Sequence, residues 1–172
     1  MSLFERIWRG YGRFLYVCGF VAGYTTFAMM LLVIANAASR FLFNAPVAGA
    51  FEITESMLTV LIFLSLALTQ YEGGHIQVVL LTQRLPHGLQ KLARLFALAL
   101  GAVFFAWCAQ AAWGYALKAF TINEQQWGAI RYPLYPVKFI VFFGLILLAI
   151  QYLLGFIREL IGAEHSEELA SK

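Results

Sequence analysis

The sequence contains no aspartate, and all nine of its acidic residues are glutamates. This absence excludes a catalytic aspartate, the Walker B carboxylate of nucleotide hydrolases and the aspartate-rich loop that binds calcium. The only two cysteines, Cys18 and Cys108, lie far apart in apolar stretches, so they predict neither a zinc site nor a disulfide framework. We expect both to pack as small apolar side chains.

Charge is also scarce, because charged residues make up only 12% of the 172 residues, against about 25% in a typical soluble domain. Hydrophobic residues make up 62%, and the mean hydropathy is +0.76. A chain of this size cannot hide so much apolar surface from water, and disorder requires the opposite composition. The net charge of +3 is too small and too scattered for a nucleic-acid-binding protein. The composition therefore predicts an integral membrane protein.

Long stretches without a charged residue mark the expected membrane spans. These stretches are Phe14–Ser39, Ser56–Tyr71, Leu95–Leu117 and Phe139–Ile157. About 20 helical residues cross the hydrocarbon core, so the second stretch is long enough only if its helix begins near Ala48. We predict one all-α membrane domain over residues 1–172, with an interfacial helix at 1–13, spans at about 14–38, 48–71, 95–117 and 137–158, and a polar tail at 159–172.

Two short segments have the pattern of interfacial helices. Residues 1–13 place Arg6, Arg9 and Arg13 opposite an apolar face, and residues 86–94 show a similar pattern. A solvated loop with chance periodicity is the alternative for both segments. A signal peptide is the alternative for the first span, but its apolar run is long for a signal peptide, and no small-residue cleavage site follows before Arg40.

The basic residues predict the orientation of the chain. By the expected spans, eight of the twelve Lys and Arg residues flank one side of the membrane, namely Arg6, Arg9, Arg13, Arg84, Lys91, Arg94, Arg158 and Lys172. The other four, Arg40, Lys118, Arg131 and Lys138, flank the opposite side. Because basic residues are enriched in cytoplasmic flanks, we expect both termini in the cytoplasm.

A cluster of ionisable residues lies between the first two spans. Glu52 and Glu55 are three residues apart, so they share a helix face, and they lie at a helix start, where the helix dipole favours negative charge. Arg40 lies across a connection that Asn44 and Pro46 turn, so we expect it to approach these carboxylates. Two alternatives are that all three side chains reach interfacial water, and that the glutamates relay protons. The position of the glutamates in the first helical turns argues against a relay.

A second cluster follows the second span, where Gly73 and Gly74 are expected to end the helix and His75 follows in a loop. His75 is interpreted as a hydrogen-bonding loop residue, with a pH-sensitive group as the alternative. None of the three histidines falls in a span, so haem held between helices is not expected.

A third cluster precedes the last span and consists of Arg131, Pro133, Tyr135, Pro136 and Lys138. The two prolines predict an extended segment that no helix passes through. Tyr132, Tyr135 and Trp127 suit an interfacial aromatic belt. Anchoring is the simplest role of this segment, whether or not it also binds a partner. Within the spans we find too few polar side chains to line a path for a solute.

These clusters resemble the small membrane subunit (Q-type, DctQ-like) of tripartite ATP-independent periplasmic (TRAP) transporters. The resemblance rests on Arg-Phe-Leu-Phe-Asn-Ala-Pro at 40–46 with Gly-Ala-Phe-Glu-Ile-Thr-Glu at 49–55, on Gly-Gly-His-Ile-Gln-Val at 73–78, and on Pro-Leu-Tyr-Pro-Val-Lys at 133–138. It extends over roughly residues 14–157. The chain departs from the family pattern at Glu72, where a basic residue is common, and at Val79, where an acidic residue is common.

The resemblance implies a four-span subunit of the bacterial inner membrane that accompanies a large M-type transport subunit and a periplasmic P-type substrate-binding protein. The large subunit moves organic acids by an elevator-like, sodium-coupled motion. The small subunit is then a scaffold that helps to dock the binding protein. We expect it to contact lipids and to have no catalytic residue, no cofactor, no metal site, no nucleic-acid partner and no direct contact with substrate.

Two other classes of function remain as alternatives. One is a self-sufficient small transporter, coupled to protons through Glu52 or Glu55. The other is an integral-membrane enzyme or redox subunit, against which the missing aspartate and the lack of histidine within the spans both count.

Overall fold

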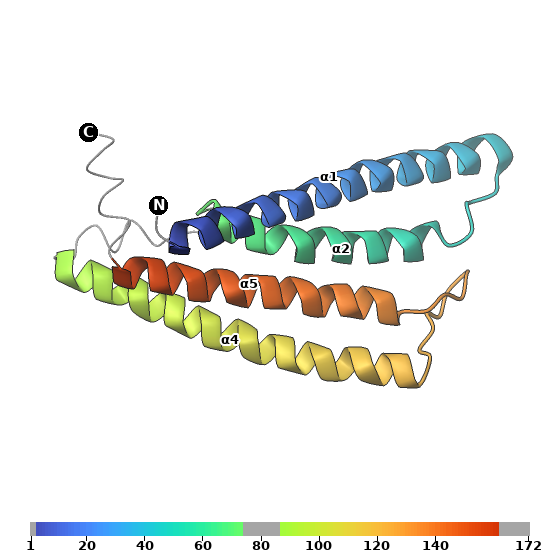
Figure 1. Cartoon of the computed structure of the whole chain (residues 1–172). Coiled ribbons are helices and arrows are strands. Elements are labelled where there is room, and N and C mark those ends of the chain that lie inside the picture. Colours follow the sequence, from blue (N-terminus) through green and yellow to red (C-terminus); the bar gives the residue numbers. More distant parts are fainter. Residues whose placement is uncertain (1–2, 74–86, 162–172) are drawn as a thin grey trace.

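The computed structural model describes residues 3–73 and 87–161, which form helices joined by loops (Figure 1). The helices are α1 (Leu3–Phe43), α2 (Ala50–Tyr71), α4 (His87–Thr121) and α5 (Tyr135–Ile161). Each of the four is long and apolar enough to cross a membrane, and no named strand occurs in the described ranges. The prediction of an all-α chain with four spans is confirmed.

Two helix boundaries show how local chemistry sets the spans. Helix α2 begins at Ala50, close to the expected Ala48, and includes Glu52 and Glu55 in its first two turns, so the predicted early start of this helix is confirmed. Helix α5 begins at Tyr135, which makes the prediction of an extended Pro136 wrong. The first helical bond runs from the Lys138 N–H to the Leu134 carbonyl (3.3 Å), so Pro136 lies in the first turn, where its missing N–H has no partner to lose.

Helices α1 and α4 are longer than a bilayer requires. With 41 and 35 residues they rise about 61 and 52 Å, against a hydrocarbon core of about 30 Å. Residues 3–13 and 87–94 are therefore continuous with the spans that follow them and form no helices of their own. The position of these two segments at the membrane interface stays a prediction, as does the cytoplasmic side of the termini.

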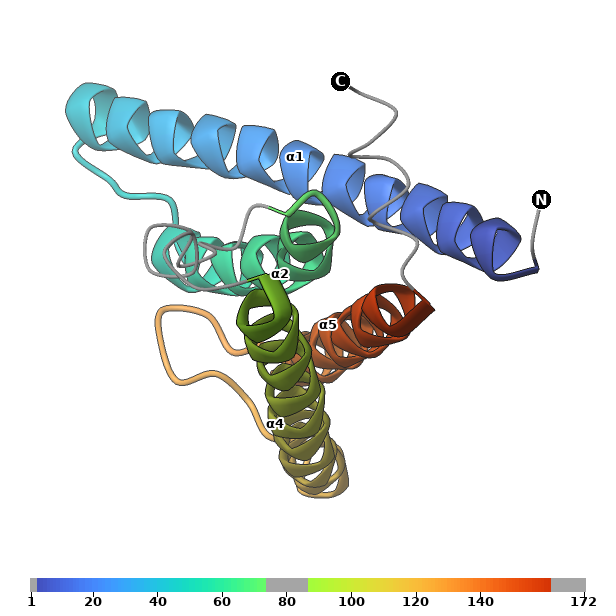
Figure 2. The same ribbon diagram turned by 90° about the vertical axis from the view of Figure 1, so that its left-hand side faces the viewer.

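The helices pack in the order α1, α2, α5, α4 (Figures 1 and 2). Helix α1 packs on α2, α2 packs on α5, and α5 packs on α4. Figure 1 shows α1 diverging from α2 towards Phe43, whereas its first half stays close to the other helices. The result is an open array, in which much of the apolar surface of each helix faces outward.

The core lies where α1, α2 and α5 meet. It consists of Leu15, Cys18, Ala22, Leu64, Ala67, Leu147 and Leu148. Burial of Cys18 confirms that this cysteine packs as a small apolar side chain, whereas Cys108 is half-buried. The Tyr11 hydroxyl donates to the Leu147 carbonyl (2.5 Å), which joins α1 directly to α5.

A second set of contacts ties the helices together at the end of the array where α1 begins. The Trp8 ring packs on Tyr71 (5.1 Å between centroids), and the Arg158 guanidinium lies 4.9 Å from the Trp8 ring centre. Arg94 of α4 pairs with Glu159 of α5 at 3.9 Å. All four helices therefore take part in these contacts, which explains why α1 diverges only at its other end.

The contact between α2 and α5 depends on Gly144, because a Cβ atom there would collide with the Phe63 backbone. We predict that Gly144→Ala lowers the stability by about 1–3 kcal/mol, since backbone atoms cannot move aside as a side chain can. The matched control is Gly114→Ala, at a helical position where a Cβ atom meets no neighbour. Thermal unfolding in detergent should show a lower midpoint for the first variant only, and equal midpoints would contradict the packing described.

Candidate functional site

The most densely bonded polar site in the described ranges lies where the start of α2 meets residues 122–134, the α4–α5 loop. Glu52 is only 9% exposed, and its Oε1 accepts a hydrogen bond from the Ala129 N–H at 2.6 Å. Gly128 precedes this donor, and a side chain there would collide with the Glu52 carboxylate. The helix dipole and the backbone donor together stabilise a carboxylate that would otherwise be costly to bury.

Tyr132 adds a second link between the loop and α2. Its hydroxyl donates to the Glu52 carbonyl at 2.9 Å and also contacts the Ser56 hydroxyl. One helical turn of α2 therefore bonds to the loop through a side chain, a backbone carbonyl and a hydroxyl. The sequence predicts Tyr132 only as a residue of the aromatic belt. Nothing in its spacing from Glu52 indicates the hydrogen bond that joins the two residues.

Glu55 faces the same loop but is bound less tightly. It is exposed, and its Oε2 accepts a hydrogen bond of 3.5 Å from the Gln126 side chain. The prediction that Glu52 and Glu55 share a helix face is confirmed, because both contact the α4–α5 loop. Of the two, only Glu52 is buried.

The loop is ordered by its own backbone bonds. The Gln126 N–H donates to the Tyr132 carbonyl and the Leu134 N–H donates to the Glu124 carbonyl, both at 2.9 Å. Pro133 lies between these bonds and forms a bridge with Gln125. The loop is therefore folded back on itself, so that its tip can reach Glu52.

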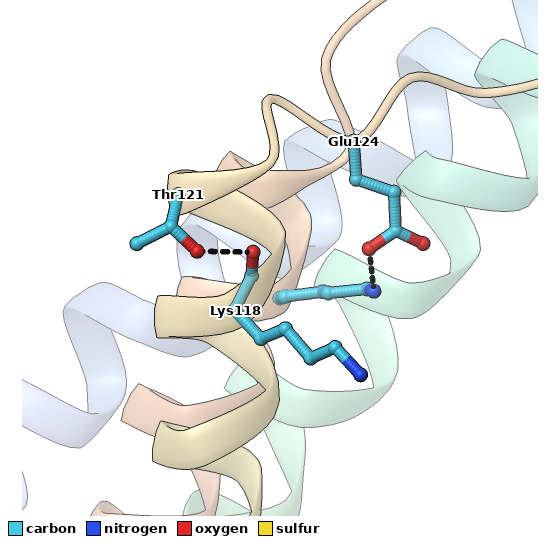
Figure 3. A network of polar contacts seen from close by, with 4 residues as sticks. Lys118, Thr121 and Glu124 are labelled. Atoms are coloured by element: carbon cyan, nitrogen blue, oxygen red, sulfur yellow. Dashed lines mark hydrogen bonds and ion pairs between the residues drawn. The ribbon is translucent and has the colours of Figure 1, made fainter.

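Ion pairing closes the base of the loop. The Lys138 ammonium donates to Glu124 at 2.5 Å, and the Thr121 hydroxyl donates to the Lys118 carbonyl at 2.8 Å where α4 ends (Figure 3). Helix α5 supplies the lysine and the loop supplies the glutamate, so this pair holds the two loop ends together.

Aromatic contacts accompany these polar ones. The Tyr135 ring packs edge-on against Phe120, with 5.4 Å between centroids, and links the start of α5 to the end of α4. Arg131 stacks on Trp127, with its guanidinium 5.1 Å from the ring centre. The predicted cluster of Arg131, Pro133 and Tyr135 therefore does lie in one loop region, together with Glu124 and Trp127.

Arg40 does not join the glutamates, which corrects the prediction that it approaches them. It is exposed in the last turn of α1, and no described contact joins it to Glu52 or Glu55. Because α1 diverges from α2 at this end (Figure 1), the α4–α5 loop and not Arg40 lies against the carboxylates.

The connection between α1 and α2 is held by other residues. The Asn36 side chain accepts a hydrogen bond from the Val47 N–H at 2.9 Å, and the Ser39 hydroxyl donates to the Ala45 carbonyl at 2.7 Å. Asn44 adopts a positive φ of 52°, and Pro46 is exposed, as expected for a turn. Asn36 did have a sequence signal, since it is a polar residue near the end of an apolar run.

The glycine prediction at the end of α2 is confirmed for Gly73, which has a φ of 73° directly after the helix. Gly74 and His75 lie outside the described residues. In the part of the chain that the structure covers, no three His, Cys, Asp or Glu side chains gather as metal ligands do. The hydrogen bonds described above make this site a joint between the α1–α2 hairpin and the α4–α5 hairpin.

Comparison with known families decides the identity. A family model described as "Tripartite ATP-independent periplasmic transporters, DctQ component" matches residues 29–162, which include the last third of α1, the whole of the joint, and helices α2, α4 and α5. The chain belongs to the DctQ family. It is the small component of a TRAP transporter, a multi-pass membrane protein of a system that also has a large subunit and a substrate-binding protein. No curated protein matches the chain.

We predict that Glu52→Ala in this DctQ protein releases the tip of the α4–α5 loop. Loss of a charged hydrogen bond costs about 1.5–3 kcal/mol, so amide exchange at the loop should accelerate roughly tenfold or more. Glu55→Ala is the matched control, because its carboxylate is exposed and weakly bound. Hydrogen exchange of the loop peptide, measured by mass spectrometry, tests this prediction. Equal exchange rates in the two variants would contradict the contact between Glu52 and the loop.

Proposed function

We propose that the chain is a non-catalytic scaffold of the inner membrane that braces the large transport subunit for sodium-coupled uptake of organic acids. In this proposal it also helps to dock the periplasmic substrate-binding protein and does not touch the substrate. Family membership supports the general role. The observations below support the specific one.

The observation that carries the proposal is the open array of helices. The helices pack in series, and only 6–22% of the most apolar stretch of each is buried within the chain. A carrier needs an enclosed polar path, whereas helices packed in series leave most of their apolar surface facing outward. A scaffold needs broad outward faces, and the exposed Phe20 (71%), Val103 (70%) and Trp107 (71%) provide them.

One outward face carries a polar group that lipid alone does not satisfy. An open groove of about 460 Å³ lies between α4 and α5, lined by Ala106, Ala109, Gln110, Trp113, Phe142, Ile146 and Ala149. Gln110 is exposed there, in the middle of a membrane span. Small residues allow a second helix to approach, and amide side chains bond across helix pairs in membranes. We assign this groove to a helix of the large subunit.

The α4–α5 loop is the proposed docking element for the binding protein. Its tip is held by Glu52, yet it presents Trp127, which is 85% exposed, with Arg131 stacked on the ring. An aromatic ring and an arginine on a fixed loop are typical of residues that dominate protein interfaces.

A proton-coupled transporter that uses Glu52 or Glu55 is not favoured by this geometry. Glu52 is held by the Ala129 N–H at a helix end, and Glu55 lies on the exposed side of the same turn. Neither carboxylate lies deep in a span, where a relay would require it.

We predict that the purified chain, reconstituted alone in liposomes, takes up no organic acid under a sodium gradient. Labelled dicarboxylates and sialic acid are suitable probes, and uptake should require both the large subunit and the binding protein. Uptake by the chain alone that Glu52→Gln or Glu55→Gln abolishes would overturn the proposal.

We further predict that Gln110→Leu weakens co-purification of the large subunit several-fold, because it removes the bond between helices and leaves the helix itself intact. Thr25→Val is the matched control, since that hydroxyl already bonds to the Val21 carbonyl of its own helix. Equal recovery of the large subunit with both variants would exclude the α4–α5 groove as its contact.

A further inference from the structure

One face of α1 takes no part in the joint or in the α4–α5 groove assigned to the large subunit. Arg6, Arg9 and Arg13 lie along this face in the first turns. Four aromatic residues, Tyr16, Phe20, Tyr24 and Phe27, continue it at intervals of three or four residues. Such spacing places side chains on one side of a helix. We call this face the α1 stripe, and all seven of its side chains are exposed.

The aromatic part of the α1 stripe lines an open apolar groove of about 410 Å³. Gly19 and Gly23 widen it, and Leu68 of α2 forms its other wall. From Tyr16 to Phe27 the helix rises about 16 Å, and one leaflet of the hydrocarbon core is about 15 Å deep. The groove therefore has the length of one leaflet.

The basic part of the α1 stripe ends at Arg13, about one turn before the groove. Helical side chains lean towards the N-terminus, so the guanidinium groups of Arg9 and Arg13 extend away from the hydrocarbon. Within the described residues neither forms an ion pair with a carboxylate. Glu72 lies close to the Tyr16 hydroxyl, and Glu5 is one turn from Arg9. Three guanidinium groups of the α1 stripe thus outnumber the two carboxylates next to it, and Glu159 at the same end pairs with Arg94.

We propose that the α1 stripe binds one anionic phospholipid, with its phosphate on Arg9 and Arg13 and one acyl chain in the groove. Guanidinium groups bind phosphate oxygens in pairs, and an acyl chain matches both the apolar lining and the leaflet-deep length. A second helix would fill the groove but would supply no phosphate to the arginines. The charge count predicts that this end lies in the cytoplasmic leaflet, where anionic lipids are abundant. The site does not depend on the proposed scaffold role.

Native mass spectrometry of the full chain in mild detergent tests the headgroup contact. We expect one molecule of phosphatidylglycerol to bind about tenfold more tightly than phosphatidylcholine with the same acyl chains. Arg9→Gln with Arg13→Gln should abolish this difference, whereas the two Arg→Lys changes, which keep the charge, should retain most of it. Arg40→Gln is the matched control, because it removes an exposed arginine from the other end of the same helix.

A groove variant tests the acyl chain separately. Gly23→Leu places a side chain where a Cβ atom meets no neighbour, so it fills the groove without disturbing the fold. It should weaken binding of both lipids several-fold, whereas Gly114→Leu, at an equally open position on α4, should not. Equal affinity for the two lipids, or unchanged binding by Gly23→Leu, would overturn the proposal. So would a dimer in the same spectra that Gly23→Leu removes, because a second copy would then occupy the groove.

Discussion

The hydrogen bond between the Glu52 carboxylate and the Ala129 N–H joins the two hairpins of the chain at the end where the α4–α5 loop lies. Because lipid chains are as apolar as the helices, the hydrophobic effect does not drive helices together in a membrane. Close packing and polar bonds must hold them together. Here the α2 helix dipole and the Ala129 N–H both stabilise the Glu52 carboxylate. Gly128 leaves room for that carboxylate because it has no side chain. The Tyr132 hydroxyl adds a second bond between the loop and α2, to the Glu52 carbonyl. Without this joint, the packing of α5 on α1 and α2 and the contacts at the opposite end of the array would alone set how the two hairpins lie.

The opposite end is held by different chemistry. Trp8 contacts Tyr71 and Arg158, and Arg94 pairs with Glu159, so aromatic rings and cations join all four helices there. Because contacts at both ends hold the helices together, the outer faces of the array need no further contact within the chain. That arrangement suits a subunit whose partners are lipid and a larger protein, because each outward face is then free for one of them.

The sequence predicted much of this architecture, for identifiable reasons. Charge-free runs near the length of a bilayer predicted the spans, and spacing of three residues placed Glu52 and Glu55 on one face. Gly73 ended α2 because glycine accepts a positive φ. The partner of Glu52 was missed, because its donor is the backbone of Ala129, 77 positions away, and backbone groups leave no sequence signal. The predicted position of Arg40 was wrong, because it rested only on opposite charge and on closeness in the sequence. The divergence of α1 from α2 keeps Arg40 away from the two glutamates.

The proposed scaffold role requires that this DctQ protein stays rigid while the large subunit moves substrate. Spin labels at Phe51, in the first turn of α2, and at Val103 on α4 are both exposed and lie on either side of α5. Pulsed electron-spin distance measurements on the assembled transporter, with Cys18 and Cys108 replaced, report directly on that requirement. The account predicts the same distance distribution with and without sodium and substrate. A shift of the main distance by about one helical turn, ~5 Å, would contradict it.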